Sequence, residues 1–139
     1  MSDRHFVDTN ILVYAHDLDA GKKHATARNL VSHLWESRAG VLSTQVLQEF
    51  YVTVTRKISL PLSKPETRGI LKNYFNWSLV VIDAPVIMQA SEIEETRKLS
   101  FWDALILSAA FSANATTLLT EDLNHGQVIE GILIKNPFI

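Results

Sequence analysis

Residues 6–15 read FVDTNILVYA, and this stretch decides how the fold begins. A short apolar run at residues 5–7 has the character of a strand, and residues 11–15 have that of a short helix. The polar break between them has two interpretations. In the simpler one, Asp8 or Thr9 caps the helix. In the other, Asp8 is a carboxylate held at the end of a strand, where it can take part in chemistry.

Composition indicates an ordinary globular domain. The chain has 139 residues, 47% of them hydrophobic and 20% charged, so we expect a single domain over residues 1–139. The formal net charge of −2 provides no bulk attraction to nucleic acid or to an anionic membrane. A polyanion would therefore have to bind through a local basic patch or through bridging cations. The absence of cysteine excludes disulfides, thiolate nucleophiles and zinc-thiolate sites.

Two stretches bear on the compartment. The N-terminal residues MSDRHFVD contain no apolar signal region, which favours a cytoplasmic protein. Residues 104–120 are apolar enough to suggest a membrane span, but they include Ser, Asn and Thr and follow directly on Asp103. They lack a clean run of roughly 20 apolar residues. We therefore interpret this segment as a buried helix followed by a strand.

Strand and helix patterns alternate along the chain. Short strands are expected at residues 5–7, 41–43, 79–82, 116–119 and 132–134. Helices are expected at about residues 11–15, 22–38, 44–58, 64–77, 84–98 and 101–114, with Ser63, Asp83 and Ser100 as caps. Residues 79–82 form the clearest strand pattern, typical of a strand buried on both faces, and residues 132–134 are expected at an edge. The alternation predicts an α/β fold, with a mostly parallel central sheet of four to five short strands and helices on both faces.

Four acidic residues are expected at the same edge of this sheet. Asp8 and Asp122 directly follow strands, and Glu49 and Asp103 lie in the first turns of helices. In an open α/β sheet, ligands bind beyond the carboxyl ends of the strands. Taken singly, Asp8 and Asp103 are explained as helix caps and Asp122 as a turn residue. Glu49 has no such explanation, because its neighbours on the helix are apolar or uncharged.

Considered together, the four acids favour a cation site. Carboxylates gathered in one pocket repel each other by several kcal/mol, unless they are protonated or bridged by cations. Oxygen ligands suit Mg²⁺ or Mn²⁺, whereas zinc is disfavoured by the lack of cysteine and of a suitable histidine pair. A water on such an ion can become the attacking hydroxide, and the ion can bind a phosphodiester.

Other chemistries find less support. No Gly-x-Gly-x-x-Gly, no Gly-x4-Gly-Lys-Ser/Thr and no Gly-x-Ser-x-Gly motif is present, which argues against nucleotide-cofactor, NTPase and serine-hydrolase functions. Two other classes stay open. One is a non-catalytic RNA-binding or protein-interaction module with the same fold. The other is a receiver-like phosphoacceptor domain, for which Lys135 stands in a poor context.

Four motifs, in this order, resemble those of one family. They are FVDTNIL (residues 6–12), QEFY (48–51), SFWDALI (100–106) and LTEDLNHG (119–126). Over essentially its whole length, the chain resembles the PIN-domain ribonucleases, and in particular the VapC-type toxins of bacterial toxin–antitoxin pairs. The resemblance implies an endoribonuclease, dependent on Mg²⁺ or Mn²⁺, that cuts single-stranded or loop regions of RNA.

The resemblance also implies roles for individual residues. The acidic quartet that would be catalytic and hold the metal consists of Asp8, Glu49, Asp103 and Asp122. Asp8 and Asp103 would be the most direct ligands, and Asn10 and Thr120 match polar positions that support the site. Glu121 adjoins Asp122, and only the Thr-x-Asp pattern favours Asp122 as the inward carboxylate.

Partners follow from the resemblance as well. It implies a homodimer and a small antitoxin protein that inserts near the site. Three basic pairs, Lys22-Lys23, Arg56-Lys57 and Arg97-Lys98, are candidates for phosphate contacts, but solvated helix ends explain them equally well. We therefore assign no RNA-contacting residue from the sequence, and neither the RNA nor the antitoxin is specified by it.

Overall fold

The computed structural model describes residues 3–139. In chain order the strands of this part are β1 (His5–Val7), β2 (Gly40–Ser43), β3 (Ser78–Val80), β4 (Thr117–Leu119), β5 (Val128–Ile129) and β6 (Ile132–Lys135). The helices are α1 (Thr9–His16), α2 (Lys22–Ser37), α3 (Thr44–Arg56), α4 (Lys64–Tyr74), α5 (Ala84–Arg97) and α6 (Phe101–Ser112). These elements confirm the predicted α/β fold, with one more strand than expected.

The strands form a single sheet with the order β3-β2-β1-β4-β6-β5. Every neighbouring pair is parallel except β5 and β6. In the centre Val7 pairs with Leu119, so β1 and β4 end side by side. The residues that follow these two strands, from opposite ends of the chain, are therefore neighbours.

Two sequence expectations about the sheet are wrong. The run at residues 79–82 is not buried on both faces: β3 is an edge strand, and Val81 beyond it is 63% exposed. The strand expected at the edge, residues 132–134, lies instead between β4 and β5. The real edge there is β5, which is two residues long and shows no periodicity. Gly131, with φ +78°, makes the tight connection from β5 to β6.

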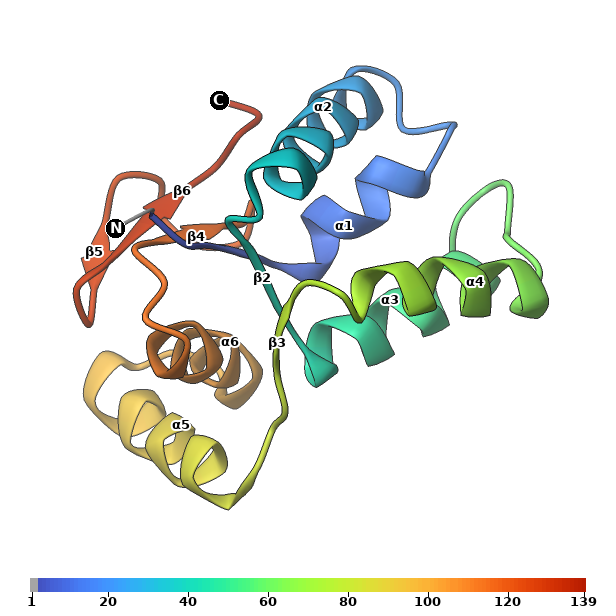
Figure 1. The fold of residues 1–139 in the computed structure, drawn as a ribbon. Helices are drawn as coiled ribbons and strands as arrows, with labels where there is room; N and C mark the ends of the chain where they lie inside the picture. Colours follow the sequence, from blue (N-terminus) through green and yellow to red (C-terminus); the bar gives the residue numbers. More distant parts are fainter. Residues whose placement is uncertain (1–2) are drawn as a thin grey trace.

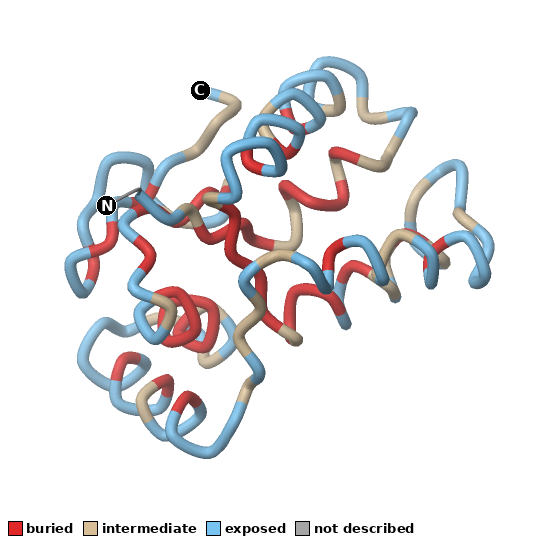
Figure 2. Tube along the Cα trace, in the orientation of Figure 1, coloured by how far each residue is buried: buried red, intermediate tan, exposed pale blue. Residues whose placement is uncertain are grey.

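Helices cover both faces of the sheet. Figure 1 shows α1 and α2 on one side, α5 and α6 on the other, and α3 with α4 beside the ends of the central strands. Helix α6 is buried from Ala104 to Ala110, as its nearly uniform apolar sequence predicts. Figure 2 shows the buried residues concentrated in the central strands and α6, while the outer sides of α2 and α5 face solvent.

Short polar side chains start the helices, as several sequence patterns predict. Ser63, Asp83 and Ser100 accept hydrogen bonds from backbone N–H groups in the first turns of α4, α5 and α6. Ser43 does the same for α3. The N-terminal turns of α1, α3 and α6 converge, since residues from all three line one pocket.

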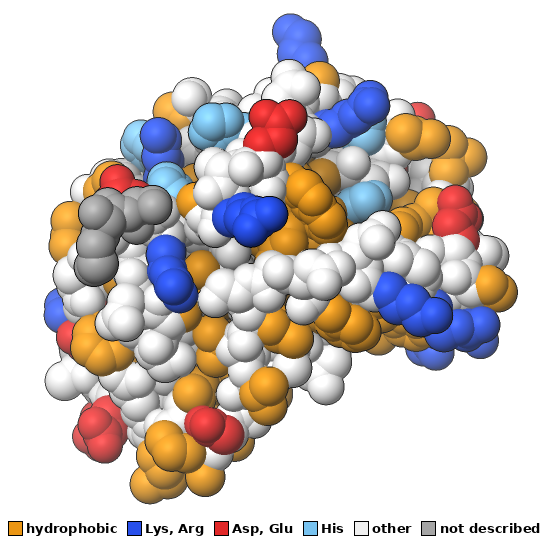
Figure 3. All heavy atoms as spheres, viewed as in Figure 1, with side chains coloured by type: hydrophobic (Ala, Val, Ile, Leu, Met, Phe, Trp, Pro, Cys, Tyr) orange, Lys and Arg blue, Asp and Glu red, His pale blue; other side chains and the backbone are white. Residues whose placement is uncertain are grey.

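None of the helices in residues 3–139 has both the length and the apolar character needed to cross a bilayer. Residues 104–120 divide into α6 and β4, as expected. On the face in Figure 3, acidic and basic side chains are interspersed, apart from a group of basic ones at the right-hand end, over the α3–α4 pair.

Candidate active site

A pocket of about 780 Å³ lies beyond the carboxyl ends of the central strands. Its walls come from α1, from α3 and the residues that follow it, from the first turns of α6 and from the segment after β4. All four acids of the predicted quartet line it: Asp8, Glu49, Asp103 and Asp122. The structure thus brings four carboxylates to one pocket, although the two most distant ones, Asp8 and Asp122, lie 114 positions apart in the sequence.

Asp8 both caps α1 and lines the pocket. Its Oδ1 accepts a hydrogen bond of 2.7 Å from the backbone N–H of Thr9, and its Oδ2 accepts one of 2.8 Å from the Thr120 hydroxyl. The two interpretations of the opening motif are therefore compatible, with Thr9 as the first helical residue and Asp8 as its cap. Each carboxylate oxygen has two lone pairs, so both keep capacity for a further ligand.

None of the described residues that act on the pKa of Asp8 is a cation. The side chain is only 7% exposed. Burial raises the pKa of Asp8 to about 7, and the nearby carboxylates of Asp122 and Glu49 act in the same direction. The hydrogen bonds from Thr120 and Thr9 act in the opposite direction but do not outweigh burial. A cation at this position would relieve both the desolvation and the repulsion.

The start of α1 also orients two other acids. The Thr9 hydroxyl donates a 2.6 Å hydrogen bond to Glu49 Oε1, and Asn10 Nδ2 donates a 2.9 Å bond to Asp122 Oδ2. Burial raises the pKa of Asp122, and the charges of Asp103 and Glu121 add to the effect. Three consecutive residues, 8–10, therefore contact or supply three of the four acids. The role of Thr9 was not predicted, because a threonine after a strand has no distinctive spacing.

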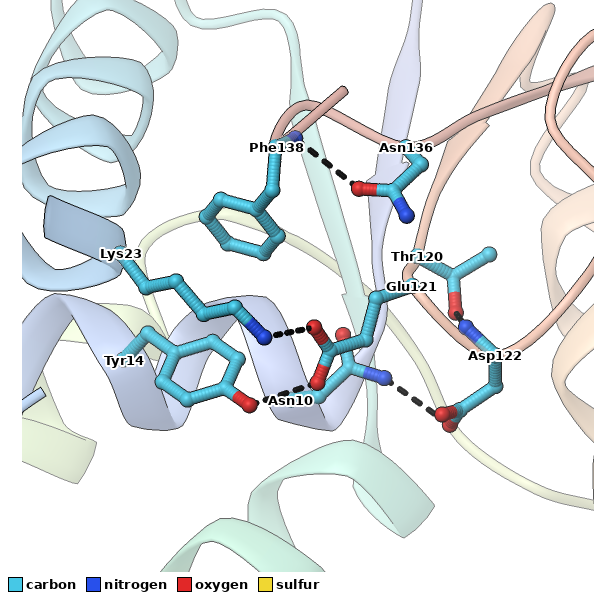
Figure 4. A network of polar contacts seen from close by, with 8 residues as sticks. All are labelled: Asn10, Tyr14, Lys23, Thr120, Glu121, Asp122, Asn136 and Phe138. Carbon is cyan, nitrogen blue, oxygen red and sulfur yellow. Dashed lines mark hydrogen bonds and ion pairs between the residues drawn. The ribbon is translucent and has the colours of Figure 1, made fainter.

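Glu121 points away from the pocket, unlike its neighbour. Figure 4 shows Tyr14 and Lys23 reaching Glu121, while Asn10 reaches Asp122. The Tyr14 hydroxyl and Lys23 Nζ lie 2.6 and 2.8 Å from the Glu121 carboxylate. Burial acts to raise the pKa of Glu121, but these contacts outweigh it and the pKa is lowered. Asp122 is thus the carboxylate that the structure places at the pocket, as the Thr-x-Asp pattern indicated.

The three candidate basic pairs lie in different surroundings. Lys23 is occupied by Glu121 and lies over the ring of Tyr14. Arg97 forms an ion pair with Glu130 at 3.8 Å. Of the six residues in these three pairs, Lys57 is the one that lines the pocket.

The sequence model of the family described as PIN domain matches residues 5–130. The chain belongs to the PIN domain family. This match confirms the family inferred from the four sequence motifs. A comparison with curated protein sequences gave no match.

Solved structures share the PIN fold of this chain. One is a toxin–antitoxin complex from Klebsiella pneumoniae, with TM-score 0.68, 21% identity, and coverage of 96% of this chain and 97% of that one. VapBC2 from Rickettsia felis, bound to a DNA fragment from its promoter, has TM-score 0.65, 24% identity, and coverage of 95% and 97%. VapC20 of Mycobacterium tuberculosis, a toxin that cleaves the sarcin–ricin loop, has TM-score 0.62, 18% identity, and coverage of 82% and 86%.

The pocket of this PIN domain has the donor atoms that a hard divalent ion requires. Besides the carboxylates, Asn10 Oδ1 is a buried oxygen that has no hydrogen-bond partner in the described residues. Within residues 3–139 no three His, Asp or Glu side chains stand close enough to hold an ion between them. The site fits an ion such as Mg²⁺, which keeps several waters and binds through one or two carboxylates.

Gln45 and Trp102 line the same pocket and were not singled out from the sequence. Gln45 Nε2 donates a 3.4 Å hydrogen bond to the Trp102 backbone carbonyl. Gln45 is the second residue of α3, and Trp102 lies within the SFWDALI motif, immediately before Asp103. The one feature of the sequence that could have indicated Trp102 as a pocket residue is its position next to Asp103.

Proposed function

We propose that this PIN domain is an endoribonuclease that hydrolyses RNA phosphodiester bonds with Mg²⁺ or Mn²⁺. The observation that carries the proposal is the meeting of Asp8, Glu49, Asp103 and Asp122 around one pocket, in which no cation among the described residues acts on Asp8. VapC20, which has the same fold, is a toxin that cleaves an RNA loop, and this supports RNA as the substrate class.

In the proposed mechanism Asp8 and Asp103 would bind the ion most directly, and Glu49 and Asp122 would contact it through its bound waters. When bound, Mg²⁺ or Mn²⁺ would lower the pKa of a water ligand, and it would stabilise the negative charge that develops during the displacement at phosphorus. Asp8 is the ligand whose orientation is most firmly set, because the Thr9 amide and the Thr120 hydroxyl hold both of its oxygens. A water molecule adds to phosphorus and gives up a proton, and the bond from phosphorus to the leaving oxygen breaks. The leaving oxygen takes up a proton, so the products are a phosphate monoester and a hydroxyl group.

Glu49 and Asp122 complete the site in this proposal. The hydroxyl of Thr9 orients Glu49, and the amide of Asn10 orients Asp122, so both carboxylates keep one oxygen free of protein hydrogen bonds. We assign them to metal binding or to the positioning of the attacking water. Asn10 and Thr120 act as supporting residues, through the acids that they contact.

We further propose that the protein is the toxin of a type II toxin–antitoxin pair. The structures from Klebsiella pneumoniae and Rickettsia felis are toxin–antitoxin assemblies with this fold, which supports a small antitoxin protein as the partner. A homodimer is proposed from the family resemblance. A toxin directed at cellular RNA would meet its substrate in the cytoplasm, which is the compartment we propose.

Cleavage of RNA by the purified protein tests the enzymatic proposal. We expect cleavage with Mg²⁺ or Mn²⁺ and none with EDTA. Asp8→Asn should abolish cleavage and keep the parent circular dichroism spectrum, whereas Asp19→Asn, in an exposed turn outside the pocket, should cleave like the parent. Unchanged cleavage by Asp8→Asn would refute the site. Binding of Mn²⁺ without any cleavage would favour the non-catalytic module instead.

A further inference from the structure

Trp102 is unusual among the pocket residues because it is a large aromatic side chain exposed to solvent. It is 63% exposed, although it belongs to α6, the most buried helix. It lines the pocket and immediately precedes Asp103 in the sequence. Its ring packs edge-to-face on Phe101, with 5.3 Å between ring centroids, and Gln45 binds its backbone carbonyl. The backbone and one edge of the ring are thus held while the indole remains accessible.

The charge of the pocket explains why such a side chain would matter. Five carboxylates line it, and Lys57 is the one cation among the described lining residues. The five are Asp8, Asp17, Glu49, Asp103 and Asp122. Two divalent ions would neutralise at most four of these charges, so the wall itself offers little net attraction to a polyanion. An RNA chain therefore needs an uncharged contact near the scissile phosphate in addition to the ions.

We propose that Trp102 is a stacking platform for an unpaired nucleobase of single-stranded RNA beside the scissile phosphate. This inference rests on the proposed endoribonuclease function. A base stacks on an aromatic side chain only when it has left the stack of its own helix, so the platform selects unpaired nucleotides. Stacking on an aromatic ring is independent of charge and tolerant of sequence, which suits an acidic pocket.

A second observation points to a nucleotide at the same wall. Gln45 is 6% exposed and lines the pocket. Its Nε2 donates to the Trp102 carbonyl, whereas its Oε1 has no partner among the described residues. A buried acceptor without a donor is costly, and a ligand that brings a donor removes the cost. A nucleotide has such donors in its exocyclic amino groups and its ribose 2′-OH.

The experiment combines removal of the Trp102 side chain with removal of single bases from the RNA. Cleavage kinetics in Mn²⁺ are measured for the parent, Trp102→Ala, Trp102→Phe and Phe111→Ala on a single-stranded RNA with one mapped cleavage site. Phe111 is the matched control, since it is an exposed aromatic on α6 outside the pocket lining. We expect Trp102→Ala to raise KM by about 5- to 150-fold, the range that corresponds to the stacking of one base. Trp102→Phe should retain most of the affinity and Phe111→Ala all of it, with kcat nearly unchanged throughout.

An RNA with a single abasic nucleotide, placed in turn on either side of the scissile phosphate, completes the test. At one position the parent should lose affinity as Trp102→Ala does, and Trp102→Ala should lose nothing further, because the interaction is already absent. Independent, additive losses would overturn the stacking contact. So would an unchanged KM for Trp102→Ala, while parent activity would leave the endoribonuclease proposal intact. A parent inactive on every RNA would refute both.

A protein occupant of this surface gives a different result. If Trp102 is instead covered by a second copy of the chain, Trp102→Ala shifts the sedimentation of the protein toward a smaller species. The abasic substitution would then affect the parent and the variant equally. That combination would overturn the proposal.

Discussion

The Thr120 hydroxyl donates a 2.8 Å hydrogen bond to Asp8 Oδ2, and it accepts one of 3.1 Å from the backbone N–H of Asp122. Thr120 is fully buried. One hydroxyl therefore joins two acids of the pocket that lie near opposite ends of the chain. This contact exists because β1 and β4 are adjacent and parallel and end at the same level.

Replacement of Thr120 by valine, which has a similar shape, should weaken Mn²⁺ binding. The variant loses a hydrogen bond that lowers the pKa of Asp8 and leaves the Asp122 amide without its acceptor. A hydrogen bond to a charged group contributes about 1.5–3 kcal/mol, so the affinity at pH 7 should fall by about tenfold or more. Isothermal titration measures the change. Thr120→Ser keeps the hydroxyl and should bind nearly as the parent does. Equal affinities of Thr120→Val and the parent would contradict the role assigned to Thr120.

The contribution of Asp8 to the stability of the metal-free protein should fall as pH rises from about 4 to about 7. The pKa of Asp8 is about 7 in the folded protein, raised mainly by burial, against an ordinary value of 3.8. Between these values the folded state binds a proton that the unfolded state has released, so the free energy of unfolding decreases with pH. About three pKa units correspond to roughly 4 kcal/mol, lost in full above pH 7.

Asp8→Asn isolates this contribution. In EDTA, urea denaturation should show the variant gaining stability over the parent between pH 5 and pH 8, with Asp19→Asn following the parent. Mn²⁺ at pH 8 should stabilise the parent and have little effect on Asp8→Asn. A constant difference in unfolding free energy between parent and Asp8→Asn across this pH range would show that Asp8 does not titrate with a raised pKa.

Glu121 and Asp122 should differ sharply in metal binding. Glu121 is paired with Lys23 and Tyr14, whereas Asp122 lines the pocket. Glu121→Gln should leave Mn²⁺ affinity within about twofold of the parent, and it should have little effect on stability because its partner Lys23 is exposed to solvent. Asp122→Asn should reduce Mn²⁺ affinity. A larger loss of Mn²⁺ affinity in Glu121→Gln than in Asp122→Asn would mean that Glu121, and not Asp122, is the metal-binding residue.

Replacement by alanine should change protein stability in opposite directions at two glycines, Gly40 and Gly69. A Cβ on Gly40 would overlap the indole of Trp77, which is held by Trp35 and Tyr74, so Gly40→Ala should destabilise by about 1–3 kcal/mol. Gly69 lies within α4 with open space around it, and Gly69→Ala should stabilise by about 0.5–1 kcal/mol. Thermal and urea unfolding of both variants measure these changes. Stability of Gly40→Ala equal to that of the parent would mean that Trp77 can move aside.

Features that depend on residues close together in the chain could be predicted from the sequence. The caps at Ser63, Asp83 and Ser100 and the buried helix at residues 101–112 follow from hydrogen bonding and apolar content within a few residues. Together with the alternation of strands and helices, they determined the fold class. The rule that ligands bind beyond the carboxyl ends of parallel strands then determined the edge at which the acids gather.

Long-range pairing was decided only by the tertiary structure. An apolar run does not reveal its neighbours, so residues 79–82 resembled a central strand and form an edge, and residues 132–134 resembled an edge and are internal. Adjacent carboxylates cannot be distinguished by type. Contacts with Tyr14 and Asn10, more than 100 positions away, turn Glu121 outward and Asp122 toward the pocket. The sequence by itself determined which acids could meet, and the contacts of α1 with the segment after β4 decided that Asp122 and not Glu121 lines the pocket.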